Sequence, residues 1–214
     1  MRAQYIIDVE QPAHDVAAAP SDAKRSPPMQ FTFDVATAYD ALRRGDTVNV
    51  AALIDRMQSA STATSNSIMA KMMPEGIGAM AVSLDETRAL LLLRRGNKDE
   101  AVALLRRAAV QEDAIPFMFG PPEVVKPSHE LLGETLLSIG RAAEARHEFE
   151  LALARTPGRS LTLLDLARAS QAAGDSATAS ATYKQLVANW HRADAVTDAV
   201  REARNAAART PKRE

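Results

Sequence analysis

Histidine and glutamate stand side by side at two places in the chain, His129-Glu130 and His147-Glu148, and both residue types bind metal ions or transfer protons. A helical zinc motif needs a second histidine four residues after the first, so that both rings lie on one face of the helix. Position 133 is glycine, so His129 has no such partner. The alternative is a partly buried histidine that packs against a neighbour and keeps a hydrogen bond. We therefore predict that the protein holds no metal ion and no other cofactor.

Other common motifs for catalysis and for charge-driven binding are absent from the sequence. There is no cysteine, which excludes thiol nucleophiles, disulfides and cysteine-bound metal clusters. No G-x-S-x-G nucleophile motif and no glycine-rich phosphate loop occurs. The 26 basic and 27 acidic residues form no long run of one sign, which disfavours nucleic acid and anionic membranes as partners. We predict that the protein is not an enzyme, and keep as an alternative a metal-dependent enzyme that uses His129, Glu130, Glu134 or His147.

The amino-acid composition favours helices. Hydrophobic residues make up 46% of the 214 residues but aromatic residues only 4%, so most apolar side chains are of the kinds that helices accommodate at little entropic cost. The apolar run Tyr5–Ile7 is too short for a signal peptide, and no segment approaches the roughly 18 apolar residues of a membrane span. We expect a soluble, cytoplasmic, all-α protein, provided that Met1 is the true start.

Four glycines divide the chain beyond residue 30. Because residues 10–30 contain four prolines among polar and small residues, we expect residues 1–30 to be a tail or linker and residues 31–214 to form the folded domain. Apolar-periodic stretches end at glycines typical of helix C-caps, and Asp or Asn follows three of them, at Gly45-Asp46, Gly96-Asn97, Gly140 and Gly174-Asp175. The last two glycines are 34 residues apart, which indicates a repeated helical hairpin with insertions between the earlier copies.

One copy of this repeat carries a spaced signature between Lys126 and Arg159. The tetratricopeptide repeat has aromatic, Leu, Gly, aromatic, Ala, aromatic, Ala and Pro at fixed spacing. This chain has His129, Leu132, Gly133, Leu136, Ala145, Phe149, Ala152 and Pro157 at those places, and six of the eight match. The segment resembles the tetratricopeptide repeat family closely. In that pattern the small residues let two helices approach, and the larger ones fill the remaining space.

The resemblance implies an α-α superhelix of tetratricopeptide-like hairpins. Its units are approximately residues 31–58, 82–115, 126–159 and 160–193, and a C-terminal capping helix follows at residues 194–210. One hairpin cannot bury both of its faces, so neighbouring hairpins must stack. We expect the capping helix to shield the last repeat from water.

The resemblance also implies where a partner binds, because proteins of this family hold peptides or partner helices on the concave face lined by the first helix of each hairpin. By this resemblance the groove residues are Glu86, Arg94, Glu130, Glu134, Leu137, Arg168 and Gln171. The central glutamates would repel a peptide carboxylate, unlike the carboxylate clamp of some family members. We expect a non-catalytic scaffold for protein–protein interactions, whose protein or peptide partner and homo-oligomeric state stay open.

Two insertions lie between the repeats, and each has two interpretations. The apolar loop around Phe117, Met118 and Phe119 either fills a gap in the packing or forms a contact surface. In the earlier methionine-rich insertion, we expect Pro74 with Gly76 to break or kink any helix. Because the first repeat matches weakly and an array should begin with a cap, the chain is alternatively the C-terminal repeat portion of a larger regulator or enzyme.

Overall fold

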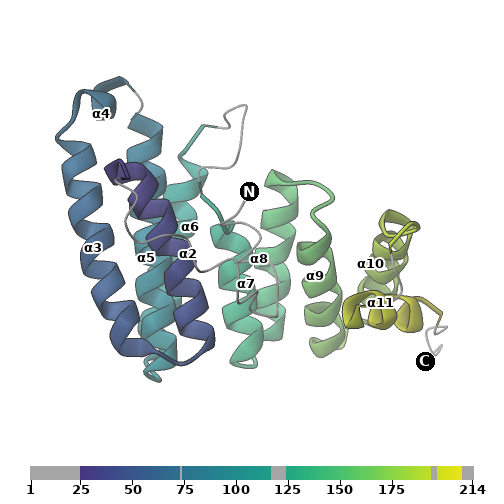
Figure 1. Ribbon diagram of the computed structural model, residues 1–214. Coiled ribbons are helices and arrows are strands. Elements are labelled where there is room, and N and C mark those ends of the chain that lie inside the picture. The colour runs from purple at the N-terminus through teal and green to yellow at the C-terminus, as the bar shows by residue number, and fades with distance from the viewer. Residues whose placement is uncertain (1–24, 73, 117–123, 194–196, 209–214) are drawn as a thin grey trace. The chain divides into compact units, whose positions relative to one another are not determined.

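The computed structural model describes residues 25–72, 74–116, 124–193 and 197–208, without the side chain of Met69. The described residues form helices joined by short turns and include no strand, so the predicted all-α repeat fold is confirmed (Figure 1). The chain divides into two compact units, Met1–Ser128 and His129–Glu214. Whether these units together make the single repeat domain expected over residues 31–214 stays a prediction. The insertion around Phe117–Phe119 lies outside the described residues.

The first unit contains two helical hairpins and one short connecting helix. Its helices are α2 (Pro27–Arg43), α3 (Thr47–Ser65), α4 (Ile68–Met72), α5 (Pro74–Arg94) and α6 (Lys98–Asp113). Helix α2 packs on α3, α5 packs on α6, and α3 also packs on α5 (Figure 1). Their buried side chains form one apolar core that includes Phe31, Val35, Val50, Met57 and Leu84.

Two helix starts in the first unit differ from the sequence-based expectation. Helix α2 begins at Pro27, within the segment expected to be a tail, and α5 begins at Pro74 and continues through Gly76. Proline is tolerated in the first turn of a helix because the backbone N–H that it lacks has no partner inside the helix there. The proline therefore marks a start where the sequence suggested a break.

The second unit contains two further hairpins and a terminal helix. Its helices are α7 (Ser128–Ser138), α8 (Ala142–Arg155), α9 (Ser160–Ala172), α10 (Ser176–Asn189) and α11 (Asp198–Ala208), and Ser128, the first residue of α7, is the last residue of the first unit. Helix α11 packs on α10 and contributes Ala203 to the core formed by Leu163, Leu164, Tyr183 and Leu186. The predicted capping helix is thus present at the end of the repeats.

The turns inside the hairpins have the predicted conformation. Gly45, Gly96, Gly140 and Gly174 have backbone φ angles between 76° and 87°, in the left-handed region that glycine enters without strain. The side chains of Asp46 and Asp175 each accept a hydrogen bond at 3.0 Å from a backbone N–H in the first turn of the next helix. Asn97 makes no such bond, although a helix begins after it.

Close packing between α7 and α8 depends on small residues. A Cβ atom added to Gly133 would lie 2.6 Å from the ring of Phe149, so only glycine fits this position. Phe149, Leu132 and Leu136 are fully buried around it, as are Ala145 and Ala152 on α8. The predicted packing of this repeat is therefore confirmed by these contacts.

Candidate functional site

The structure separates the seven predicted groove residues into buried and accessible ones. Glu86 is 2% exposed and Glu130 is 0% exposed, so the expectation that these two carboxylates face a partner is wrong. Glu134, Leu137 and Arg168 are half-buried, whereas Arg94 and Gln171 are exposed. The accessible residues keep a role in binding as a prediction.

Glu130 is buried because the start of α9 covers it. Arg159 donates from Nε to Oε2 of Glu130 at 2.6 Å and from Nη2 to Oε1 at 3.1 Å, which is the bidentate geometry of a strong ion pair. The hydroxyl of Thr162 also donates to Oε2. These contacts join α7 to the start of α9, and Glu130 therefore stabilises the second unit from inside.

Glu86 is buried at the corresponding place in the first unit, and its partners lie just before α7. The Ser128 hydroxyl donates to Oε1 of Glu86 at 2.7 Å, and the Ser128 backbone N–H donates to Oε2 of Glu112 at 2.6 Å. Burial raises the pKa of Glu86 well above its ordinary value, and repulsion from Glu112 adds to this, while Ser128 and Lys126 act in the opposite direction. The protonated form of Glu86 is therefore favoured in the folded protein.

The two His-Glu pairs do not converge on a metal site. His129 Nδ1 lies 2.7 Å from Oε2 of Glu148 on α8, and both side chains are largely buried. His147 is exposed. In the part of the chain that the structure describes, no group of three histidine, aspartate or glutamate side chains is arranged to hold a metal ion. His129 is therefore a packing residue with a carboxylate partner, which is how the sequence pattern placed it.

Arg168 is held by acidic side chains of its own unit. Its Nε and Nη2 donate to the two carboxylate oxygens of Glu202 on α11 at 2.9 and 2.6 Å, and Nη1 donates to Asp165 at 3.0 Å. The hydroxyl of Tyr183 on α10 donates to Glu202 at 2.9 Å. Hydrogen bonds from Arg168 lower the pKa of Glu202, and burial together with Glu202 raises the pKa of Tyr183. The cluster fastens the capping helix to the last hairpin.

Four accessible residues of the predicted groove form matched pairs on two neighbouring helices. Glu134 and Leu137 are three residues apart on α7, and Arg168 and Gln171 are three residues apart on α9. Residues three apart on a helix share a face. The contacts of Glu130 with Arg159 and Thr162 show that α7 and α9 are neighbours. These four residues are the candidate partner-binding face of the second unit.

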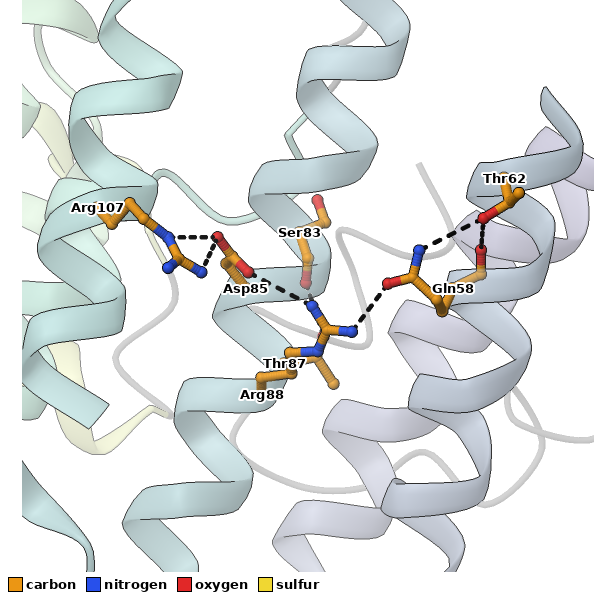
Figure 2. Close-up of polar contacts among 7 residues, drawn as sticks. All are labelled: Gln58, Thr62, Ser83, Asp85, Thr87, Arg88 and Arg107. Carbon is orange, nitrogen blue, oxygen red and sulfur yellow. Dashed lines mark hydrogen bonds and ion pairs between the residues drawn. The ribbon is translucent and has the colours of Figure 1, made fainter. Parts of the chain in front are cut away.

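A polar network on the first unit connects three helices, and the sequence pattern did not identify it. Figure 2 shows Arg107 of α6 donating to Asp85 of α5 at 2.9 and 3.1 Å, and Arg88 donating to Gln58 of α3 at 2.8 Å. Arg88 also lies 3.7 Å from Asp85, and Gln58 contacts Thr62. Asp85 thus takes the contacts with cations that Glu86, its neighbour in sequence, was expected to offer a partner.

A shallow pocket also lies in the first unit, between the start of α5 and the end of α6. Its volume is about 450 Å³, and it is lined by Pro74, Glu75, Gly78, Ala81, Gln111, Ala114, Ile115 and Pro116. Glu75 is its only ionisable side chain among these described residues. An acid–base or nucleophilic site needs convergent reactive groups, which this lining does not provide.

The helices themselves give no sign of a membrane span. Over the ranges that the structure describes, none of them combines the length and the apolar character needed to cross a bilayer.

Comparison with known proteins identifies one family. The model of the tetratricopeptide repeat matches residues 83–107 and 160–185, which contain most of α5, the first part of α6, and much of the α9–α10 hairpin. No curated protein and no solved structure matches the chain.

Proposed function

We propose that this chain, which is a helical repeat protein of the tetratricopeptide type, works as a non-catalytic scaffold that binds a protein or peptide partner. Repeats of this type generally mediate protein interactions and generally lack catalytic activity. The binding face that we propose is formed by Glu134 and Leu137 of α7 together with Arg168 and Gln171 of α9. Its partner would be a peptide or a helix with both apolar and charged side chains.

The observation that carries this proposal is the repetition of one accessible pair on adjacent helices. The positions of Glu134 and Leu137 recur 34 residues later as Arg168 and Gln171, so successive repeats present equivalent residues on one face. Gln171 is exposed and makes no hydrogen bond through its side chain, and Leu137 offers a half-exposed apolar contact. Arg168 is already oriented by Glu202 and Asp165, which reduces the conformational entropy that binding would cost.

The test is a double substitution on the accessible part of α7, Glu134→Lys with Leu137→Asp. Proteins captured by the purified full chain would be identified by mass spectrometry and compared with those captured by the unchanged chain. Glu130 is unsuitable for such a test, because reversing a buried, ion-paired charge reports on folding and not on binding.

Lys184→Glu is the matched control, since Lys184 is exposed on α10 and makes no ion pair. Circular dichroism would verify that both variants stay folded. We expect the α7 double variant to lose partners that the Lys184→Glu variant keeps. Identical sets of captured proteins from both variants would mean that this face is not the binding surface.

A further inference from the structure

Two carboxylates in the first unit hold one residue between them, away from water. Glu86 on α5 accepts the Ser128 hydroxyl, and Glu112 on α6 accepts the Ser128 backbone N–H. Exposure is 2% for Glu86, 8% for Glu112 and 5% for the nearby Lys126. Ser128 is also the residue at which the first compact unit ends. A buried polar cluster therefore controls the end of this unit.

The charges of this cluster do not balance unless it binds a proton. Two ionised carboxylates and one ammonium group give a net charge of −1 (−2 + 1), counted over Glu86, Glu112 and Lys126. Asp85, next to Glu86 on α5, is also acidic, but it is paired with Arg107 and Arg88. An unbalanced charge away from water is strongly disfavoured, and one proton on a carboxylate brings the cluster to neutrality.

Glu86 is the carboxyl group that is better placed to hold this proton. Glu112 accepts from the backbone N–H of the first residue of α7, where the helix dipole favours an anion. Glu86 accepts only a hydroxyl in the described contacts and is the more deeply buried of the two. The charged groups facing it are Asp85 on its own helix, Glu112 on α6 and Lys126 in the segment before α7.

We propose that Glu86, Glu112 and Lys126 form a proton-dependent clamp that fastens Ser128 to α5 and α6. With one proton bound, the cluster is neutral and both Ser128 contacts are kept. When the proton leaves, the two carboxylates repel each other across Ser128 and its contacts weaken. This clamp does not depend on what the proposed binding face holds.

The sign of the pH dependence follows from proton linkage. Because the pKa of Glu86 is raised on folding, the folded protein binds this proton more tightly than the unfolded chain does. The associated stability is fully present below the ordinary pKa of glutamate and is lost as the pH rises through the raised pKa of Glu86. The clamp is therefore closed in acid and loosened in base.

Glu86→Gln tests the clamp, because glutamine keeps the shape and the acceptor oxygen of a protonated glutamate. The midpoint of thermal unfolding of the full chain would be measured between about pH 5 and about pH 9. We expect the variant and the unchanged protein to agree at the acidic end, and the unchanged protein to fall below the variant by about 2–4 °C at the basic end. A difference that stays constant over this range would overturn the proposal.

The Ser128 amide gives a local measurement by NMR. In the unchanged protein its chemical shift should follow the titration of the clamp, and in Glu86→Gln this inflection should disappear. Lys126→Met provides a second variant, because loss of the ammonium should move the inflection to higher pH. An inflection that is retained in Glu86→Gln, or unmoved in Lys126→Met, contradicts the clamp.

Glu130→Gln is the matched control in the second unit, where Arg159 balances the buried carboxylate without a proton. It should lower the unfolding midpoint while leaving the Ser128 inflection in place. Loss of the inflection in this control would assign the titration to a group outside the clamp and would overturn the proposal.

Discussion

Glu86 in the first unit and Glu130 in the second occupy equivalent places but are stabilised in different ways. They lie 44 residues apart, as do the turn glycines Gly96 and Gly140 of their hairpins. Each accepts a hydroxyl, from Ser128 in the first unit and from Thr162 in the second. The hydroxyl residues are themselves 34 residues apart, which is the repeat period.

The two sites differ in the group that offsets the negative charge. Glu130 has a bidentate arginine, whereas Glu86 faces a second carboxylate and one lysine. The comparison shows that one position of a repeat can bury an acid either by ion pairing or by protonation. Only the second solution makes the unit sensitive to pH.

Removal of the Glu130 charge should have the largest effect. Glu130→Gln leaves Arg159 without its carboxylate in a largely buried place, where its side chain is 22% exposed. We expect the free energy of unfolding to fall by about 3 kcal/mol, the lower end for breaking a buried pair, because some water reaches Arg159. Urea denaturation followed by circular dichroism measures this. A loss below about 1 kcal/mol would place the pair among ordinary surface ion pairs and end the contrast between the two sites.

Deletion of the hydroxyl groups should separate the two sites by pH. Ser128→Ala and Thr162→Val each remove a hydroxyl that donates to a buried carboxylate, and each should cost about 1–2 kcal/mol near neutral pH. The cost of Ser128→Ala should grow as the pH rises, because a hydroxyl stabilises an ionised Glu86 more than a protonated one. The cost of Thr162→Val should stay constant. Urea denaturation at several pH values measures both, and parallel pH curves would contradict the difference in charge balance.

Replacement of the guanidinium should show how much the bidentate geometry contributes. Arg159→Lys keeps the positive charge near Glu130 but cannot reproduce two parallel hydrogen bonds. We expect a loss of about 1 kcal/mol in the free energy of unfolding, smaller than that of Glu130→Gln. If lysine served as well as arginine, charge alone would be sufficient, and the lysine in the first unit would need no proton beside it.

The smallest effect is expected at the ion pair of the capping helix. Arg168 and Glu202 are about one-third exposed, so Glu202→Gln should cost only about 0.5 kcal/mol in the free energy of unfolding. Arg168 lowers the pKa of Glu202, so this contribution is present above the ordinary glutamate pKa and is lost as the pH falls through the lowered value. The dependence is opposite in sign to that of Glu86. Thermal unfolding in acid compares the two, and a cost retained below pH about 3 would exclude an electrostatic origin.

Much of the fold could be predicted from local patterns. The turn glycines, the caps Asp46 and Asp175, and the small residues around Phe149 each act within one hairpin, so their chemistry is visible over a few tens of residues. The start of α5 at Pro74 was missed, because proline breaks a helix interior but fits a first turn. A local pattern alone cannot distinguish these two positions.

The candidate site could be predicted only in part. Periodicity placed Glu130 and Glu134 on one helix face, yet the first is fully buried and the second half-buried. The difference arises because Arg159 and Thr162, 29 and 32 residues away, cover Glu130. The missed partners did leave a signal in the equal spacing of Glu86 from Glu130 and of Gly96 from Gly140.

By itself the sequence determined that this chain is a series of helical hairpins, because helix caps, turn glycines and apolar spacing act through short-range backbone chemistry. Only the tertiary structure decided which acids face solvent and which are enclosed. Burial depends on the helix that packs from the next repeat, and a carboxylate enclosed in this way must find either a cation or a proton. The same residue type at the same repeat position is therefore an ion-pair partner at Glu130 and the basis of the proposed clamp at Glu86.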